Sequence, residues 1–167
     1  MKRNYILIVL CLLVSLFIYM FYRTEKTVIN DLFVHLLSCD RFVSLQKTVS
    51  NKLPLNELVV YSLPEGLWVF CITLTSKLFF VRIGRHQLGL IFLPLIFSIG
   101  LEMFQLIRLA NGRFDLWDIL MSVFCWGIAG VLPTDRSDSR NIVYPVTAHS
   151  LICIGTYLIV FLAHVWQ

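Results

Sequence analysis

Long apolar runs separated by polar gaps are the feature that most constrains this chain. Each run is close to the roughly 20 residues that a helix needs to cross a hydrocarbon core. The charged side chains gather mainly in the gaps between the runs. We therefore predict an all-α integral membrane protein, a single domain over residues 1–167 with about five transmembrane helices. These spans are expected at residues about 5–22, 63–81, 88–107, 116–132 and 143–166.

The composition supports a membrane protein over a soluble one. Apolar residues make up 58% of the chain and charged residues 14%, and mean hydropathy is +0.80. Soluble domains contain about 45–50% apolar and about 25% charged residues. The net charge is +4, but the basic residues flank apolar runs, as they do in the loops of membrane proteins. We therefore predict that nucleic acid is not a partner.

The cysteines do not form a pattern typical of a disulfide framework or a metal site. Four of the five lie inside apolar runs, and no closely spaced pair such as CxxC occurs. Buried cysteines of this kind pack as small hydrophobic residues. The sequence therefore predicts neither a metal site nor a cofactor.

The first run resembles a signal peptide at its basic start, Lys2 and Arg3. It ends in Tyr19–Arg23, which contains no small-x-small cleavage site, so we expect an uncleaved anchor helix. The polar segment at 23–60 follows. Within it, apolar residues recur at helical spacing over residues 28–37, which predicts an amphipathic helix on the membrane surface.

Two local motifs mark the boundaries of the next spans. Ser62 and Glu65 have the spacing of a capping box, and Pro64 suits a first helical turn, so the second span is expected to begin there. Residues 82–87 read as a tight basic loop between the second and third spans. Placing this loop and Lys2 inside predicts a cytoplasmic N-terminus and a C-terminus outside the cell membrane.

Polar side chains inside the third run form the first half of a candidate site. Ser98, Glu102 and Gln105 fall on one helix face, and Arg108 follows at the interface. An ionisable group inside a spanning helix costs about 2.5–3.5 kcal/mol at mid-bilayer on insertion scales. Glu102 therefore needs a structural or functional reason.

The second half of the site begins the fourth run. Asp115, Asp118 and Ser122 share a face there, and Arg113 precedes them. The connection over residues 109–114 is short, so the two helices must be antiparallel neighbours with these groups at the same depth. The candidate binding residues are Glu102, Gln105, Arg108, Arg113, Asp115, Asp118 and Ser122. The catalytic residues of an enzyme are unknown, with Glu102 and Asp118 as candidates.

A purely structural interpretation accounts for part of this cluster. Asp115 suits an N-cap, and Asp118 suits the positive end of the helix dipole. Glu102 would then pair with Arg113 or Arg108 and lock the hairpin. Glu102 and Gln105 are explained by no cap, which favours a polar pocket.

At these residues the sequence resembles the VanZ-like family, small membrane proteins named for a teicoplanin-resistance protein. The similarity rests on Glu102-Met-Phe-Gln105, on Gly112-Arg113-Phe114-Asp115-Leu-Trp-Asp118, and on the spaced Gly127 and Gly130. Ser122 and Cys125 stand where the family pattern has Asn and Gly. The resemblance implies a multi-helix cell-envelope protein, in some members lowering susceptibility to lipoglycopeptides.

Three functions follow as hypotheses. The favoured one is an outward-facing pocket that binds a lipid head group, a lipid-linked cell-envelope intermediate or an amphiphilic antibiotic, with Arg113 and the start of the fourth helix favouring an anionic group. The second is an intramembrane enzyme acting on a lipid or peptidoglycan precursor, with Glu102 as acid or base and Asp115 with Asp118 on a divalent metal. The third is a structural subunit of a membrane complex.

Overall fold

The computed structural model describes residues 2–22, 39–109, 113–133, 140–142, 145 and 147–165. These ranges are mostly helical, as predicted, but they also contain a three-stranded sheet, so the all-α prediction is wrong in that part. The surface helix predicted at 28–37 lies outside the described residues. The helices are α1 (Lys2–Tyr22), α3 (Cys39–Lys52), α4 (Glu57–Ser76), α5 (Leu93–Leu106), α6 (Leu116–Val131) and α7 (Ala148–Val165), with a 3-10 turn, η1 (Leu90–Phe92). The strands are β1 (Phe79–Ile83), β2 (His86–Gly89) and β3 (Arg140–Asn141).

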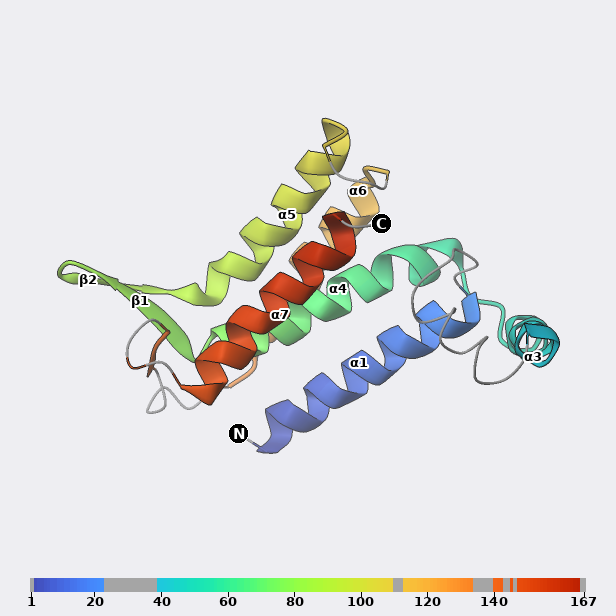
Figure 1. Cartoon of the computed structure of the whole chain (residues 1–167), viewed down its shortest axis with the longest axis horizontal. Helices are drawn as coiled ribbons and strands as arrows, with labels where there is room; N and C mark the ends of the chain where they lie inside the picture. Colours follow the sequence, from blue (N-terminus) through green and yellow to red (C-terminus); the bar gives the residue numbers. More distant parts are fainter. Residues whose placement is uncertain are drawn as a thin grey trace.

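The long helices run back and forth between two ends of the molecule (Figure 1). We call one the sheet end, because the strands lie there with the end of α4 and the starts of α5 and α7. We call the other the turn end, because it holds the α5–α6 connection and the start of α4. α4 lies in the middle, with its most extensive contacts to α6 and then to α1. The short helix α3 lies beside the end of α1, where Gln46 Nε2 donates to the carbonyl of Met20 at 2.8 Å.

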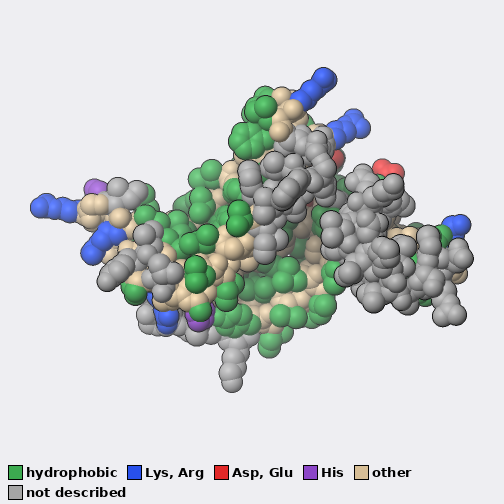
Figure 2. All heavy atoms as spheres, in the orientation of Figure 1, with side chains coloured by type: hydrophobic (Ala, Val, Ile, Leu, Met, Phe, Trp, Pro, Cys, Tyr) green, Lys and Arg blue, Asp and Glu red, His purple; other side chains and the backbone are tan. Residues whose placement is uncertain are grey.

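Two of these helices are long and apolar enough to cross a membrane, over Asn4–Tyr22 and Glu57–Ser76. A signal sequence near an N-terminus, or the buried core helix of a soluble protein, meets the same criteria of length and composition. The other apolar helices are shorter, at Leu90–Leu106, Leu116–Val131 and Ala148–Leu158. Hydrophobic side chains cover much of the surface along the helices, and basic side chains stand toward the ends (Figure 2).

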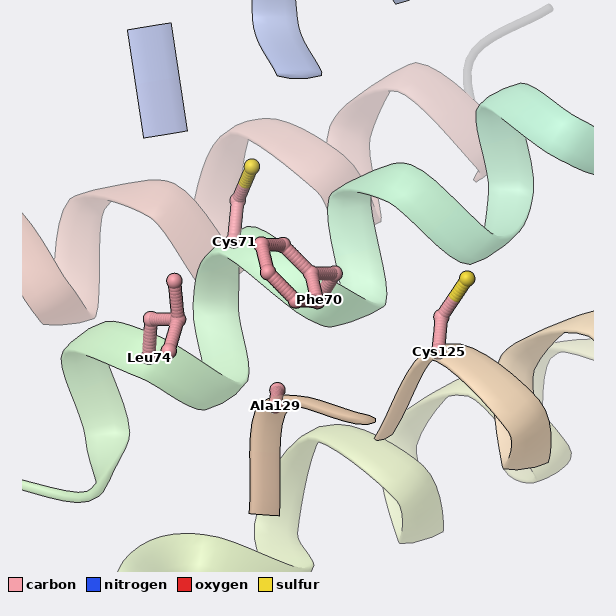
Figure 3. Close-up of a cluster of buried hydrophobic side chains, with 5 residues drawn as sticks. All are labelled: Phe70, Cys71, Leu74, Cys125 and Ala129. Atoms are coloured by element: carbon pink, nitrogen blue, oxygen red, sulfur yellow. The ribbon is translucent and has the colours of Figure 1, made fainter. Parts of the chain in front are cut away.

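The core lies where α4 meets α6 and α1. Gly66 brings α4 close to α6, since a Cβ at this position would lie 2.6 Å from Met121 Cγ, 2.8 Å from Cys125 Sγ and 3.1 Å from the Met121 carbonyl oxygen. Further along, a buried cluster joins the helices: Phe70, Cys71, Leu74, Cys125 and Ala129 (Figure 3). Leu7, Ile8 and Cys11 of α1 pack against this cluster. Cys11, Cys71, Cys125 and Cys153 are free thiols, in keeping with their predicted role as small hydrophobic residues.

The start of α4 differs from the prediction. The helix begins at Glu57, after an extended Asn56, so the capping box at Ser62 is wrong and Pro64 and Glu65 lie inside the helix. Proline has no N–H to donate to the preceding turn, so it is typical of a first helical turn. Pro64 therefore predicted a helix start, although it lies inside the helix. The continuous helix carries Glu65 into the bundle, about 12 Å from the α4 start at 1.5 Å per residue.

A β-hairpin replaces the facing ends of the predicted second and third spans. Phe79–Ile83 is rich in the aromatic and β-branched residues that favour strands. The two-residue loop begins with Gly84 at φ +61°, a position where glycine is preferred. β1 pairs antiparallel with β2, with Val81 opposite Leu88, and parallel with β3, with Phe80 opposite Asn141.

Lys77 joins the end of α4 to the end of α6. Its Nζ donates to the carbonyl oxygens of Ala129 and Gly130, both at 2.9 Å, and of Leu132 at 2.7 Å. These carbonyls are among the last of α6, which have no helical partners and form the negative end of the helix dipole. This lysine, inside a predicted span, is thus compensated by the end of a neighbouring helix.

Candidate functional site

Buried polar side chains meet where α4, α5 and α6 come together near the middle of these helices. Ser98 of α5 and Ser122 of α6 are fully buried, and the Ser98 Oγ donates to the Ser122 Oγ at 2.9 Å. The same Ser98 Oγ lies 3.5 Å from Glu65 Oε1. A serine hydroxyl has one hydrogen, so it donates fully to one of these two acceptors at a time. Glu65, Ser98 and Ser122 therefore form one continuous polar group across three helices.

Glu65 is the carboxylate that α4 contributes to this junction. It is 9% exposed, and its Oε2 accepts a hydrogen bond from the Trp68 indole at 2.7 Å. The Trp68 ring packs edge-on against Phe97 of α5, with centroids 6.2 Å apart. The adjacent Gly66 allows α4 to approach α6, which keeps this carboxylate close to Ser122's helix. Glu65 is thus oriented by an aromatic partner and by close helix packing.

Glu102 lies one turn beyond Ser98 on α5, toward the turn end. It is 2% exposed, and its Oε2 accepts a hydrogen bond from the backbone N–H of Asp115 at 3.2 Å. Asp115 is the N-cap of α6, as predicted, and its side chain accepts from the Trp117 N–H at 2.9 Å. Two carboxylates therefore hold the first amides of α6, where the helix dipole favours negative charge. This arrangement makes the start of α6 a poor place for an added anion.

Gln105 and Asp118 continue the polar surface at the α5–α6 connection. Both residues are half-buried, and the atoms Gln105 Oε1 and Asp118 Oδ1 are shielded from solvent. Among the residues that the structure describes, none donates a hydrogen bond to Gln105 Oε1. A buried acceptor left without a donor costs about 1–3 kcal/mol. Within the described residues, Gln105 Oε1 is thus a buried acceptor without a donor.

The two predicted arginines stand outside this buried group. The Arg108 and Arg113 side chains are exposed. Arg108 has a φ of 59° and ends α5, with its N–H bonded to the Gln105 carbonyl and the Leu109 N–H bonded to the Phe104 carbonyl. This is a Schellman motif with arginine at the left-handed position that glycine usually takes. The arginines therefore form an exposed rim beside the turn end, rather than lining the junction.

The structure joins some of the predicted site residues in two separate contacts and adds Glu65 and Trp68 to the polar group. Glu102 and Asp115 are bonded through the Asp115 amide, and Ser122 belongs to the Ser98 group, one helix turn deeper. Glu65 and Trp68 were not predicted. Glu65 was an ionisable residue in an apolar run, the same signal that singled out Glu102, but its spacing from Ser62 assigned it to a cap.

The buried group is rich in hydrogen-bond acceptors. Carboxylates accept at up to about four lone-pair positions each, and an amide oxygen at two. In the part of the chain that the structure describes, no group of three or more His, Cys, Asp or Glu side chains is placed to hold a metal ion. Chemically, this arrangement can accept hydrogen bonds from N–H and O–H donors.

Comparisons with known proteins return no relative: no family model matches the chain, and neither a curated protein nor a solved structure matches it.

Proposed function

We propose that this chain is a VanZ-like protein of the cell membrane with five spans, its N-terminus cytoplasmic and its C-terminus outside. The back-and-forth course of α1, α4, α5, α6 and α7 supports this, because it puts every second connection at the same end (Figure 1). The sequence segments 1–3, 77–87 and 134–141 contain seven of the 14 Lys and Arg, and five of the other seven lie in the long segment 23–56. Basic residues in short loops mark the cytoplasmic side. The shorter α5 and α6 then cross with their polar ends at the interface.

In this arrangement the junction of α4, α5 and α6 opens outward and binds the head group of an amphiphile. The observation that carries the proposal is the pair of buried carboxylates, Glu65 and Glu102, on either side of Ser98. Ionisable groups inside a membrane bundle are costly, and they mark ligand or ion pathways. A bundle of this size can be held by small residues and close packing, as at Gly66. The carboxylates are therefore best explained by a ligand.

The chemistry of the ligand follows from the acceptors. Because Glu102 and Asp115 already hold the first amides of α6, the proposed ligand presents donors to the site, either an ammonium or sugar hydroxyls. A phosphate of the same molecule would meet the exposed rim formed by Arg108 and Arg113. A lipid head group or a lipid-linked envelope intermediate has this combination of groups, and so does an amphiphilic antibiotic with amines and sugars.

One observation favours a structural role instead. The hydrogen bond from the Asp115 amide to Glu102 joins α5 to α6 by itself, so Glu102 could serve as a staple of the hairpin. A glutamine at position 102 would keep an oxygen acceptor for this amide while removing the charge. The substitution Glu102→Gln therefore separates the two roles.

The test compares two lipids that share phosphate and charge but differ in donors. Full-length protein in nanodiscs is exposed to equal amounts of phosphatidylethanolamine, which has N–H donors, and phosphatidylcholine, which has none. A third sample contains a glucosyl diacylglycerol. Lipid retained by the released protein is counted by native mass spectrometry. We expect at least tenfold preference for the ethanolamine or glucosyl lipid, lost in Glu102→Gln.

The matched control is Glu57→Gln, because Glu57 is an exposed glutamate at the same end of the molecule, outside the polar group. It should leave the preference unchanged. Equal retention of all three lipids by the wild-type protein would overturn the proposal. A preference that survives Glu102→Gln would assign Glu102 to the structural role.

A further inference from the structure

The β1–β2 hairpin at the sheet end extends away from the helices (Figure 1). Its base is held in the molecule, since Phe79 is buried with Ile142 and Cys153, and Tyr157 of α7 packs against the same cluster. β1 is the central strand between β2 and β3, so β2 is an edge strand of this small sheet. All four residues of β2 are exposed. The hairpin is therefore anchored at one end and uncovered at the other.

The two faces of the hairpin differ in character. Side chains alternate between the faces of a strand, and directly paired residues share a face. Phe79 and Val81 lie on one face, joined there by Leu88, which pairs with Val81. Arg82 and its partner Gln87 lie on the other face, which they share with Phe80 near the base of the hairpin. The middle of the hairpin is thus amphipathic, with Val81 and Leu88 on one face and Arg82 and Gln87 on the other.

The apolar face leads from the core of the molecule outward. Phe79 is 4% exposed and Val81 packs against the same cluster, but Leu88 is 55% exposed. Because this face rests on Cys153 and Tyr157 of α7, it is turned toward the helices rather than away from them. Beyond the helices, this face contacts the medium that surrounds the bundle. In the membrane arrangement proposed above, this medium is lipid.

Basic side chains surround this apolar face. Arg82, Arg85 and His86 are exposed on the hairpin, and Arg140 is exposed on β3. Basic side chains and a histidine stand out at this end in Figure 2. Lys77 is bonded to the end of α6, so the arginines carry the charge that this surface offers. None of the acidic side chains of the described residues belongs to the strands or their loop.

We propose that the hairpin is a docking surface for anionic phospholipids on the cytoplasmic face of the membrane. Leu88 and the apolar face enter the boundary between head groups and acyl chains, and Arg82, Arg85 and Arg140 contact the phosphates. An apolar face flanked by basic side chains is the pattern of interfacial segments, and anionic lipids of the inner leaflet attract such clusters. This proposal rests on the membrane placement in the proposed function, but not on any ligand at the turn end.

The experiment measures hydrogen exchange of the hairpin in two lipid environments. Full-length protein is placed in nanodiscs of pure phosphatidylcholine, or of phosphatidylcholine with one third phosphatidylglycerol. We expect peptides covering residues 79–90 to exchange several-fold more slowly with phosphatidylglycerol, and high salt to remove the difference by screening. Leu88→Ser should speed exchange in both lipids, because it removes the apolar contact.

A pair of double variants separates specific docking from net charge. Arg82→Gln with Arg85→Gln should abolish the effect of phosphatidylglycerol on these peptides. Lys47→Gln with Lys52→Gln removes the same charge from exposed positions on α3 and should retain the effect. Equal exchange in both lipids for wild-type protein, or equal loss in both double variants, would overturn the docking proposal. Wild-type protein that does not enter nanodiscs would overturn the membrane placement as well.

Discussion

The two ends of this molecule use charge in opposite ways. At the turn end the carboxylates Glu65 and Glu102 are buried among helices, and the arginines stand outside. At the sheet end the arginines are exposed, and one basic group, Lys77, is bonded to helix carbonyls. An exposed charge costs little, whereas a buried one requires compensation. The buried carboxylates are therefore the groups for which we propose a ligand, and the exposed arginines of the sheet end are the groups for which we propose contact with a charged surface.

The sheet end and the turn end are predicted to lie on opposite sides of the membrane. Reporter fusions at Arg85 and at Ser137 should both be active as cytoplasmic reporters, and a fusion after Tyr22 should be active only outside. Each reporter should be either active or inactive, because it folds on only one side of the membrane. A periplasmic or extracellular reporter signal at Arg85 would place both the helix junction and the hairpin on the wrong side of the membrane.

The largest stability effect is expected at the sheet end. Lys77→Met removes the ammonium that binds three carbonyls at the end of α6. Since hydrogen bonds to charged groups contribute about 1.5–3 kcal/mol, the loss should be about 3 kcal/mol in the free energy of unfolding, measured in detergent with a mild denaturant. Arg85→Met, on the exposed loop of the hairpin, should change this free energy by less than about 0.5 kcal/mol. Equal effects would remove the distinction between structural and surface charges at this end.

A medium effect is expected where α4 approaches α6 beside the buried carboxylate. Gly66→Ala inserts a methyl group within 3.1 Å of the Met121 carbonyl oxygen, and overpacking of this kind costs about 1–3 kcal/mol. Gly127→Ala is the matched control, because no atom lies within 4 Å of its Cβ position. That control should be neutral or slightly stabilising, since alanine favours helix over glycine. Thermal unfolding of both variants checks this, and a harmless Gly66→Ala would mean that the helices are not in close contact here.

The smallest effect concerns the rim of the turn end. Arg108 occupies a left-handed conformation that costs a non-glycine residue about 1–2 kcal/mol. Arg108→Gly should therefore raise the free energy of unfolding by about 1 kcal/mol, while weakening retention of a phosphate-bearing ligand. Gain of stability without any loss of retention would show that the guanidinium has no part in binding.

Part of this arrangement could be predicted from the sequence. The start of α6 at Leu116, its Asp115 cap and the closeness of Glu102 to that cap follow from local motifs and from a short connection. The hairpin at residues 79–89 could not be separated from the ends of two spans, because hydropathy does not distinguish an apolar strand from an apolar helix. Lys77 and Glu65 were also missed. Their partners, Leu132 and Ser98, are far away in sequence, and only the packed structure brings them together.

We propose that the buried carboxylates serve a ligand rather than the fold. The most direct test is the double variant Glu65→Gln with Glu102→Gln, in which amide oxygens can still accept from Trp68 and from the Asp115 amide. Unfolding temperature and retention of phosphatidylethanolamine are measured on the same preparation. Because the cost of burying two charges is removed, we expect an equal or higher unfolding temperature together with at least tenfold weaker retention. A lower unfolding temperature with unchanged retention would contradict the claim.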